Sequence, residues 1–257
     1  MEILILCLAA LVTSLLTFFS GFGLGTILTP VFAIFFPIEM SIALTGVVHF
    51  LNNLFKLLLV GKHANKEVIL KFGLPAFFAA LLGALLLLQI SNLQPLITYS
   101  LGDKEFYITP VKLIISILLI FFALMEVIPS MKKIEFGRDK LILGGTLSGF
   151  FGGLSGNQGA LRSAFLIRSG LSKESFIATG IVIACIIDFS RLGVYSTRFL
   201  KSGLEENLSL VVAATLSAFA GAYLGSTLLK KVTFSTIQLI VTIMLIILSV
   251  AIGLGLI

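Results

Sequence analysis

The sequence predicts an all-α membrane protein, a polytopic helical bundle made of two homologous halves. Of the 257 residues, 58% are hydrophobic and only 12% are charged, which is about half the charged fraction of a globular domain. Nearly uncharged runs also recur along the chain, each long enough to cross a hydrocarbon core about 30 Å thick. We therefore expect most of the chain to lie in lipid.

Hydropathy divides the chain into eight apolar segments, and two of them are anomalous. The segments cover 3–36, 40–60, 70–90, 111–129, 141–168, 174–196, 205–229 and 235–257. As one helix the first would extend about 51 Å, and glycines interrupt it at 21–25. The run 152–159 splits the fifth into two arms of about 11 residues, each too short to span. We expect a break in both segments, with arms that form re-entrant hairpins.

An internal repeat relates the two anomalous segments. A shift of 134 residues, followed by one of 138, superposes small and hydroxyl residues: Gly25 on Gly159, Ser41 on Ser175, Thr45 on Thr179, Gly46 on Gly180, and Ala80, Gly83 and Ala84 on Ala218, Gly221 and Ala222. Transporters are commonly built from such duplications. We therefore predict two repeats of one transmembrane domain, over 1–130 and 131–257.

The basic residues of the connections predict how the halves are oriented. If every segment crosses once, these residues divide nine to six between the two sides. If segments one and five return to their starting side, the basic residues divide eleven to four. The four on the less positive side are Lys104, Lys112, Arg198 and Lys201. The second division is the clearer positive-inside pattern. It predicts inverted repeats with both termini outside the cytoplasm.

Two broken helices at related positions point to one binding site. Unpaired backbone groups at membrane depth are tolerated only inside protein or beside a wet cavity, and a helix N-terminus favours an anion. The candidate substrate contacts at the breaks are Gly23, Gly25, Thr26, Gly156, Asn157, Gln158, Gly159 and Ser163. The alternative is that the glycines only allow close helix packing.

Three ionisable residues lie deep in the second half. Arg162 follows the second break by three residues and can clamp an anion, or its side chain extends to the surface instead. Asp188 and Arg191 lie at i and i+3, a spacing at which they can form a structural ion pair. The alternative is that Arg191 contacts the substrate, while Asp188 orients Arg191 or carries a proton.

In the first half, His49, Asn52, Asn53 and Lys56 form one polar stripe at helical spacing. His49 is a second candidate for proton coupling because its ordinary pKa lies near neutrality, although a histidine hydrogen-bonded for packing fits as well. Lys56 lies close enough to the segment end to reach the surface. Thr45 and Thr179 are symmetric candidates for hydroxyl contacts to an oxyanion, unless they bond to the preceding helical turn.

Other classes of protein fit the sequence less well. The start of the chain lacks the basic region of a cleavable signal, so we expect the first segment to be retained. Cys7 and Cys185 lack metal-type spacing, and we expect no metal and no cofactor. The net charge of +6 is scattered, which argues against nucleic acid. No catalytic motif of an intramembrane enzyme is present.

The glycine-rich motifs resemble those of the TauE/SafE sulfite-exporter family. The first is the run 21–30, which ends in Pro30, with 41–46 downstream; the second is the run 153–159. The resemblance covers essentially the whole chain. It implies a secondary transporter in the cytoplasmic (inner) membrane that moves sulfite, thiosulfate or a sulfonate such as sulfoacetate, usually by proton-coupled export.

This chain also departs from the family pattern. Its glycine runs are reduced, Ala164 replaces the second-half proline, and Asn157, Gln158 and Arg162 make the second motif more polar. The expected partners are a small anion and the lipid bilayer, while a homodimer stays open. Transport of another small anion or of a cation, and a non-transporting role in membrane assembly, are the alternatives.

Overall fold

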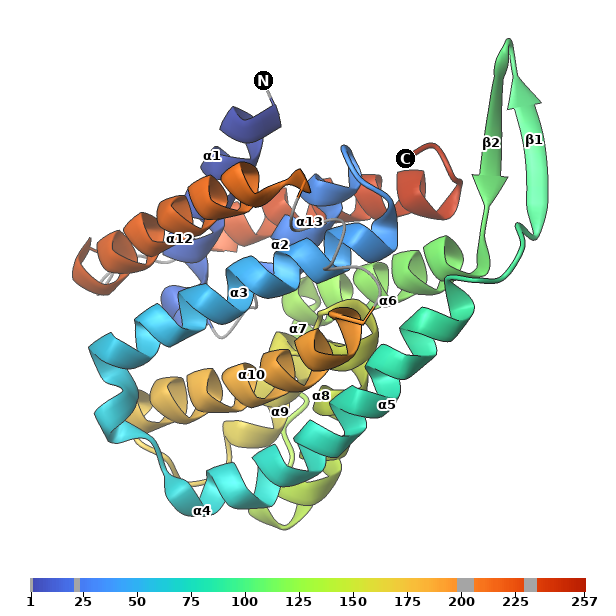
Figure 1. The fold of residues 1–257 in the computed structure, drawn as a ribbon. Coiled ribbons are helices and arrows are strands. Elements are labelled where there is room, and N and C mark those ends of the chain that lie inside the picture. The colour runs from blue at the N-terminus through green and yellow to red at the C-terminus, as the bar shows by residue number, and fades with distance from the viewer. Residues whose placement is uncertain (1, 21–23, 198–205, 229–234) are drawn as a thin grey trace.

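The structure, a computed structural model, describes residues 2–20, 24–197, 206–228 and 235–257. It is a bundle of helices with one projecting β-hairpin (Figure 1). The elements are α1 (Glu2–Ser20), α2 (Leu24–Ala33), α3 (Ile38–Val60), η1 (Gly61–His63), α4 (Lys66–Val68), η2 (Ile69–Gly73), α5 (Leu74–Ile90), β1 (Ile97–Leu101), β2 (Lys104–Ile108), α6 (Pro110–Val127), α7 (Pro129–Lys132), η3 (Arg138–Lys140), α8 (Leu141–Ser155), α9 (Gly159–Leu166), α10 (Lys173–Tyr195), α12 (Leu208–Leu228) and α13 (Ser235–Gly253).

The prediction of a helical membrane protein is confirmed. Among the described residues, five helical stretches are long and apolar enough to cross a bilayer: Ile38–His63, Lys66–Ile90, Pro110–Val127, Lys173–Tyr195 and Leu208–Thr227. Large apolar side chains also cover the outside of the bundle, among them Leu58, Leu70, Leu82 and Ile247. A soluble protein rarely exposes so much apolar surface, so these side chains face lipid.

Short polar signals set where the spanning helices begin. The Thr109 side chain accepts a hydrogen bond from the Lys112 backbone and Pro110 follows at the first helical position, which is the usual start of a helix. Ser172 caps α10 in the same way. Pro75 lacks a backbone donor, and the chain accommodates it with the π-helical turn Ile69–Gly73 just before it.

The β-hairpin was not predicted. β1 and β2 pair antiparallel across a two-residue turn in which Gly102 has a φ of 63°, a conformation that glycine adopts without strain. The Tyr99 hydroxyl donates to the Leu254 carbonyl at 2.7 Å. The hairpin is therefore attached to the end of α13, and both lie at the end of the bundle opposite α4 (Figure 1).

The two halves pack against each other through equivalent helix pairs. α5 packs along α8, and α12 packs along α1. A Cβ atom added to Gly83 would fall against the Phe150 carbonyl and the Leu154 amide, at 2.1 and 2.9 Å. One added to Gly221 would fall against the Leu11 carbonyl and the Leu15 amide, at 2.2 and 3.1 Å. The two glycines that the repeat superposes thus make the same kind of backbone contact.

Equivalent helices of the two halves also run in opposite directions. On α3 and α10, Gly46 lies opposite Arg191 while Asn65, just beyond α3, lies opposite Thr179. On α6 and α13, Ser116 lies opposite Gly253, whereas Ala123 clusters with Leu245. Both pairs are antiparallel, as an inverted duplication requires. The assignment of the halves to 1–130 and 131–257, and their inversion in a bilayer, stay predictions supported by this packing.

The fifth apolar segment returns to the end of the bundle where it began. Gly137, before α8, forms a β-bridge with Arg168, after α9, and the Phe136 amide donates to the Ala164 carbonyl at 3.1 Å. Glu67 pairs with both Lys71 and Arg138, which brings the connection before α5 to the same place. The described residues of this segment therefore adopt the predicted re-entrant shape.

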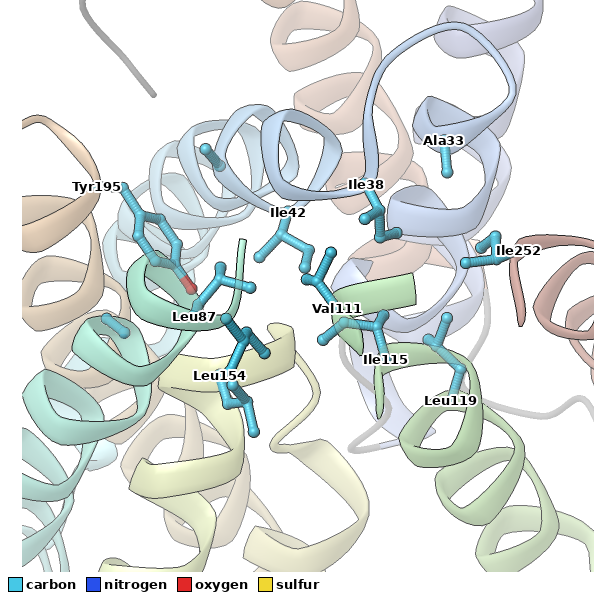
Figure 2. Close-up of a cluster of buried hydrophobic side chains, with 13 residues drawn as sticks. Ala33, Ile38, Ile42, Leu87, Val111, Ile115, Leu119, Leu154, Tyr195 and Ile252 are labelled. Atoms are coloured by element: carbon cyan, nitrogen blue, oxygen red, sulfur yellow. The ribbon is translucent and has the colours of Figure 1, made fainter. Parts of the chain in front are cut away.

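An apolar cluster contains side chains from α2, α3, α5, α6, α8, α10 and α13. Figure 2 shows Ile42 and Val111 in the middle of the cluster, with Tyr195, Leu87 and Leu154 on one side of them. The Tyr195 hydroxyl donates to the Gly153 carbonyl, so its polar group is satisfied within the apolar surroundings. The cluster contains Leu154 from α8 near the second break and Val111 from the start of α6, which follows the hairpin.

Candidate functional site

The two interrupted segments meet inside the bundle. α8 ends at Ser155, Gly156 has a φ of 79°, and α9 begins at Gly159, so the predicted second break is present. The first break separates α1 from α2, and its residues 21–23, including the predicted contact Gly23, lie outside the described residues. A Cβ atom on Gly25 would lie 3.1 Å from the Gly156 carbonyl oxygen. The start of α2 therefore touches the second break.

Buried polar atoms without a hydrogen-bond partner gather where the breaks meet. Among the described residues these include the Thr45 hydroxyl, both amide atoms of Asn157, Nε2 of Gln158 and Nη1 of Arg191. A buried polar group without a partner costs about 1–3 kcal/mol. The cluster is thus equipped to bind a polar solute or water. All four of its residues were predicted contacts: Asn157 and Gln158 from the second motif, Thr45 as a hydroxyl candidate, and Arg191 from the sixth segment.

A buried charge network joins α3 to α10 beside this cluster. Nδ1 of His49 lies 2.5 Å from one carboxylate oxygen of Asp188, and Nε of Arg191 donates to the other at 2.9 Å. Nη2 of Arg191 lies 2.8 Å from the same oxygen as an ion pair, without hydrogen-bond alignment. The ion pair that the i, i+3 spacing predicted is present, and His49 extends it. Both partners of that pair are fully buried.

Asn53 completes the network on the α3 side. Its amide nitrogen lies 3.2 Å from the His49 ring and 3.5 Å from Asp188. Arg191 also contacts both halves, because a Cβ atom on Gly46 would lie 3.4 Å from its guanidinium and one on Gly156 would lie 2.9 Å from Nη1. Asp188 is therefore a single carboxylate shared by a histidine and an arginine at the crossing of the broken helices.

A small polar cavity adjoins the network on the side of α4. Its volume is about 40 Å³, and it is lined by Thr17, Leu24, His49, Asn53, Lys56, Arg162, Ser163, Leu166, Phe176, Ile177, Gly180 and Ile181. Arg162 donates to the Gln158 side chain at 3.1 Å and is 8% exposed, while Lys56 is 5% exposed. Neither side chain extends to the surface, so the snorkelling alternatives are wrong for both.

Lys56 is a charged cavity residue that the sequence did not assign to the site, and the same holds for the uncharged lining residues Thr17, Leu24, Leu166, Phe176, Ile177, Gly180 and Ile181. Lys56 belongs to the polar stripe of α3, and that spacing is the signal by which it could have been included. Arg162, Ser163, His49 and Asn53 were predicted and line the cavity.

Other predicted contacts do not line the cavity. The Thr179 hydroxyl accepts from the Asn65 backbone at 2.8 Å, so it holds a connection rather than the preceding helical turn. Asn52 accepts from Ser14 at 3.2 Å, between α1 and α3. Thr26 and Gly159 are buried at the starts of α2 and α9. The expected symmetry between Thr45 and Thr179 is therefore not kept, because only Thr45 faces the breaks.

The comparison with protein families agrees with this arrangement. A family model described as sulfite exporter TauE/SafE matches residues 6–252. The chain belongs to the sulfite exporter TauE/SafE family. No curated protein and no solved structure matches it. The resemblance predicted from the two glycine motifs is thereby confirmed, and the chain is a multi-pass membrane protein of a transporter family.

In this TauE/SafE protein a second hollow lies against the apolar cluster, near the hairpin. Its volume is about 420 Å³, and it is lined by residues near the hairpin that include Phe36, Glu39, Thr109 and Lys112. Ala33, Ile38 and Val111 belong both to this lining and to the apolar cluster. The second hollow is therefore bounded on one side by the apolar cluster, and it shares no described lining residue with the first cavity.

Proposed function

We propose that this protein is a secondary transporter that moves a small sulfur-containing anion, such as sulfite, thiosulfate or a sulfonate, across the cytoplasmic membrane. The observation that carries the proposal is that Lys56 and Arg162, from α3 and α9, line one buried cavity together. A charged side chain in a membrane segment costs several kcal/mol and is retained for function or for a partner. An anion bound between these two side chains would offset their charge.

The broken helix strengthens the attraction for an anion. Arg162 lies on the first turn of α9, and Gln158, which it contacts, directly precedes that helix. The N-terminus of a helix carries partial positive charge and unpaired amides. α9 reaches the cavity through Arg162, Ser163 and Leu166, while its N-terminus lies one turn away, beside the unpartnered polar atoms of Asn157 and Gln158. The cavity thus places two cations next to the positive end of a helix, an arrangement suited to an oxyanion.

The position of the cavity supports alternating access. It lies on the α4 side of the apolar cluster, and the basic residues Lys71, Arg138 and Arg168 cluster at that end of the bundle. Positive residues mark the cytoplasmic side, so an anion would enter from the cytoplasm. Export then requires the apolar cluster to open toward the hollow near the hairpin.

Coupling to protons is part of the proposal, with His49 and Asp188 as the residues involved. His49 lines the cavity and contacts Asp188, which also holds Arg191. A proton on His49 would draw Asp188 toward the histidine and weaken its hold on Arg191. Protonation and anion binding would thereby be linked through one carboxylate.

Counterflow in proteoliposomes tests the proposed function. Vesicles loaded with unlabelled anion should accumulate labelled sulfite or thiosulfate, with sulfoacetate, phosphate and a small cation measured in parallel. Arg162→Ala should abolish this uptake without changing the yield of folded protein, because it removes the cation beside α9. Arg168→Ala is the control, since Arg168 is exposed and paired with Glu135 at the surface. Normal sulfur-anion uptake by Arg162→Ala would exclude this cavity as the site.

A further inference from the structure

The hollow near the hairpin is lined by two opposite charges that do not pair with each other. Glu39, on the first turn of α3, and Lys112, on the first turn of α6, both line it and are both partly buried. Their charges attract each other. Neither side chain, however, forms an ion pair or a hydrogen bond with a residue that the structure describes. A carboxylate and an ammonium group therefore face one hollow, and each can contact a ligand.

The other polar groups of the lining are already used. The Thr109 hydroxyl accepts from the Lys112 backbone at 3.3 Å, and the Ser91 hydroxyl donates to the Leu87 carbonyl at 2.7 Å. The remaining described side chains that line the hollow are apolar, and some of them belong to the apolar cluster (Figure 2). Opposite charges that stay apart in such surroundings cost more free energy than in water. A molecule that carries both signs would compensate each of them.

The hollow lies at the depth of lipid headgroups. α3 and α6 are parts of stretches that are long and apolar enough to cross a bilayer, and the first turns of both helices line the hollow. A spanning helix begins where the hydrocarbon core meets the headgroup region. Ile34 and Leu256, which also line the hollow, are exposed and continue the lipid-facing surface of the bundle. The rim of the hollow is therefore within reach of a lipid.

We propose that this hollow binds the headgroup of a zwitterionic phospholipid, with the phosphate beside Lys112 and the ammonium group beside Glu39. Both contacts would be charge-assisted hydrogen bonds, and a phosphatidylethanolamine headgroup supplies both. The volume of about 420 Å³ falls within the roughly 300–1,000 Å³ of small-molecule sites. The exposed Ile34 and Leu256 would contact the start of an acyl chain. An anionic headgroup would pair with Lys112 but leave the Glu39 carboxylate without a cation.

This lipid site goes beyond the proposed transport function, and binding at it does not depend on the solute that is carried. The hollow shares no described lining residue with the cavity that contains Lys56 and Arg162. The proposed export path opens toward the hollow, so a bound headgroup would have to move aside when an anion leaves. The test therefore measures lipid binding directly, without transport.

Native mass spectrometry of the full chain in detergent tests the proposal. The protein is titrated with phosphatidylethanolamine or phosphatidylglycerol that have the same acyl chains, and binding of the first lipid is measured. The wild type should bind phosphatidylethanolamine at least about fivefold more tightly, which corresponds to about 1 kcal/mol. Glu39→Gln should bring the two lipids within about twofold, because it removes the partner of the ammonium group. Lys112→Gln should weaken both lipids, because both carry a phosphate.

A control at the same end of the bundle separates a specific site from a general effect of charge. Lys104→Gln, at an exposed position of the hairpin, should bind both lipids as the wild type does. If Glu39→Gln fails to fold, Lys112→Gln decides the test, since it should bind both lipids at least about fivefold more weakly than Lys104→Gln. Equal binding of the two lipids by the wild type, or an unchanged preference in folded Glu39→Gln, would overturn the inference. So would unchanged affinities in Lys112→Gln, and none of these results would bear on the proposed function.

Discussion

Single glycines determine how closely the two broken segments approach each other. Gly156 adopts a φ of 79°, which side-chain-bearing residues rarely adopt, and Gly25 lies against its carbonyl group. Arg191 occupies the space beside Gly156. The backbone and the guanidinium therefore share one small volume, in which any added carbon displaces part of the site.

Gly25→Leu should inactivate transport. A Cβ atom at this position would lie 3.1 Å from the Gly156 carbonyl and 3.8 Å from Thr45, so the rest of a leucine would push α2 away from the second break. We expect the counterflow rate to fall at least about tenfold. Gly193→Leu is a matched control because a Cβ atom there meets nothing within 4 Å. Equal rates in the two variants would show that the contact between the breaks is not needed.

His49→Gln should separate exchange from proton-driven accumulation. Glutamine keeps a hydrogen-bonding side chain beside Asp188 but cannot take up a proton. We expect counterflow to be reduced by less than about tenfold and accumulation driven by a pH gradient to be lost. His63→Gln, at an exposed position, should retain both activities. Full gradient-driven accumulation by His49→Gln would assign the coupling to another group.

The sequence could identify the polar residues of the site but not the partner of each. The spacing of His49, Asn53 and Lys56 places them on one helix face, and Asp188 with Arg191 predicts an ion pair. Whether Lys56 is buried depends on what α9 places opposite it, and no local pattern contains that information. For the same reason the sequence treated Thr45 and Thr179 alike, although Thr179 binds the backbone of a distant connection.

At the scale of helices, the glycines of α8 form a stripe that allows α5 to pack with backbone contact. Gly145, Gly149 and Gly153 face Phe72, Ala76 and Ala80 in the same order along both helices, so the two helices run parallel. Small residues at such spacing let membrane helices approach closely. The glycines of this stripe therefore allow close helix packing, which was the alternative to a role in the binding site. Gly156 and Gly25 instead lie at the breaks.

Gly149→Leu should destabilise the bundle rather than alter substrate binding. A Cβ atom at Gly149 would lie 2.2 Å from the Ala76 carbonyl oxygen, and overpacking of this kind costs about 1–3 kcal/mol. We expect a lower midpoint of thermal unfolding in detergent and less monodisperse protein. Thr146→Leu, at an exposed position on the same helix, should unfold as the wild type does. An unchanged midpoint for Gly149→Leu would mean that α5 and α8 can separate without cost.

The hairpin shows the limit of prediction for short elements. Polar and apolar side chains alternate along the five residues of β1 but not along β2, where Lys104 and Glu105 are followed by Phe106, Tyr107 and Ile108. One strand of five residues is too short for a period of two to stand out in an apolar chain. The stability of the hairpin also depends on distant residues, because Tyr99 bonds to Leu254 and Tyr107 packs against Gly255. The sequence therefore indicated only a connection between two spans.

For the whole molecule, the duplication could be predicted because it preserves small residues at helix contacts. The Gly83 and Gly221 contacts are equivalent in structure as they are in the repeat. Gly83 contacts residues 150 and 154, and Gly221 contacts residues 11 and 15, so these equivalent partners are 139 positions apart in the sequence. Gly25 and Gly159, at the starts of the second arms, are only 134 positions apart. The first half thus has five more residues between its first arm and its second, which a fixed shift in the sequence could not reveal.

The proposed orientation can be tested with single cysteines in a chain from which Cys7 and Cys185 have been removed. Arg138→Cys and Arg168→Cys flank the fifth apolar segment, and Asp103→Cys lies in the turn of the hairpin. If that segment is re-entrant, both arginine positions lie on the same, cytoplasmic side and the hairpin lies outside. An impermeant maleimide added to intact cells should then label only position 103, and after lysis it should label all three.

A different labelling pattern would select the competing topology. Were segment five a single crossing of the bilayer, positions 138 and 168 would lie on opposite sides, and exactly one of them would react in intact cells. That outcome would contradict the return of α9 to the start of α8, which the bridge between Gly137 and Arg168 describes. It would also remove the basis for the cavity's cytoplasmic entrance, because Lys56 and Arg162 would no longer lie beside the end rich in positive charge.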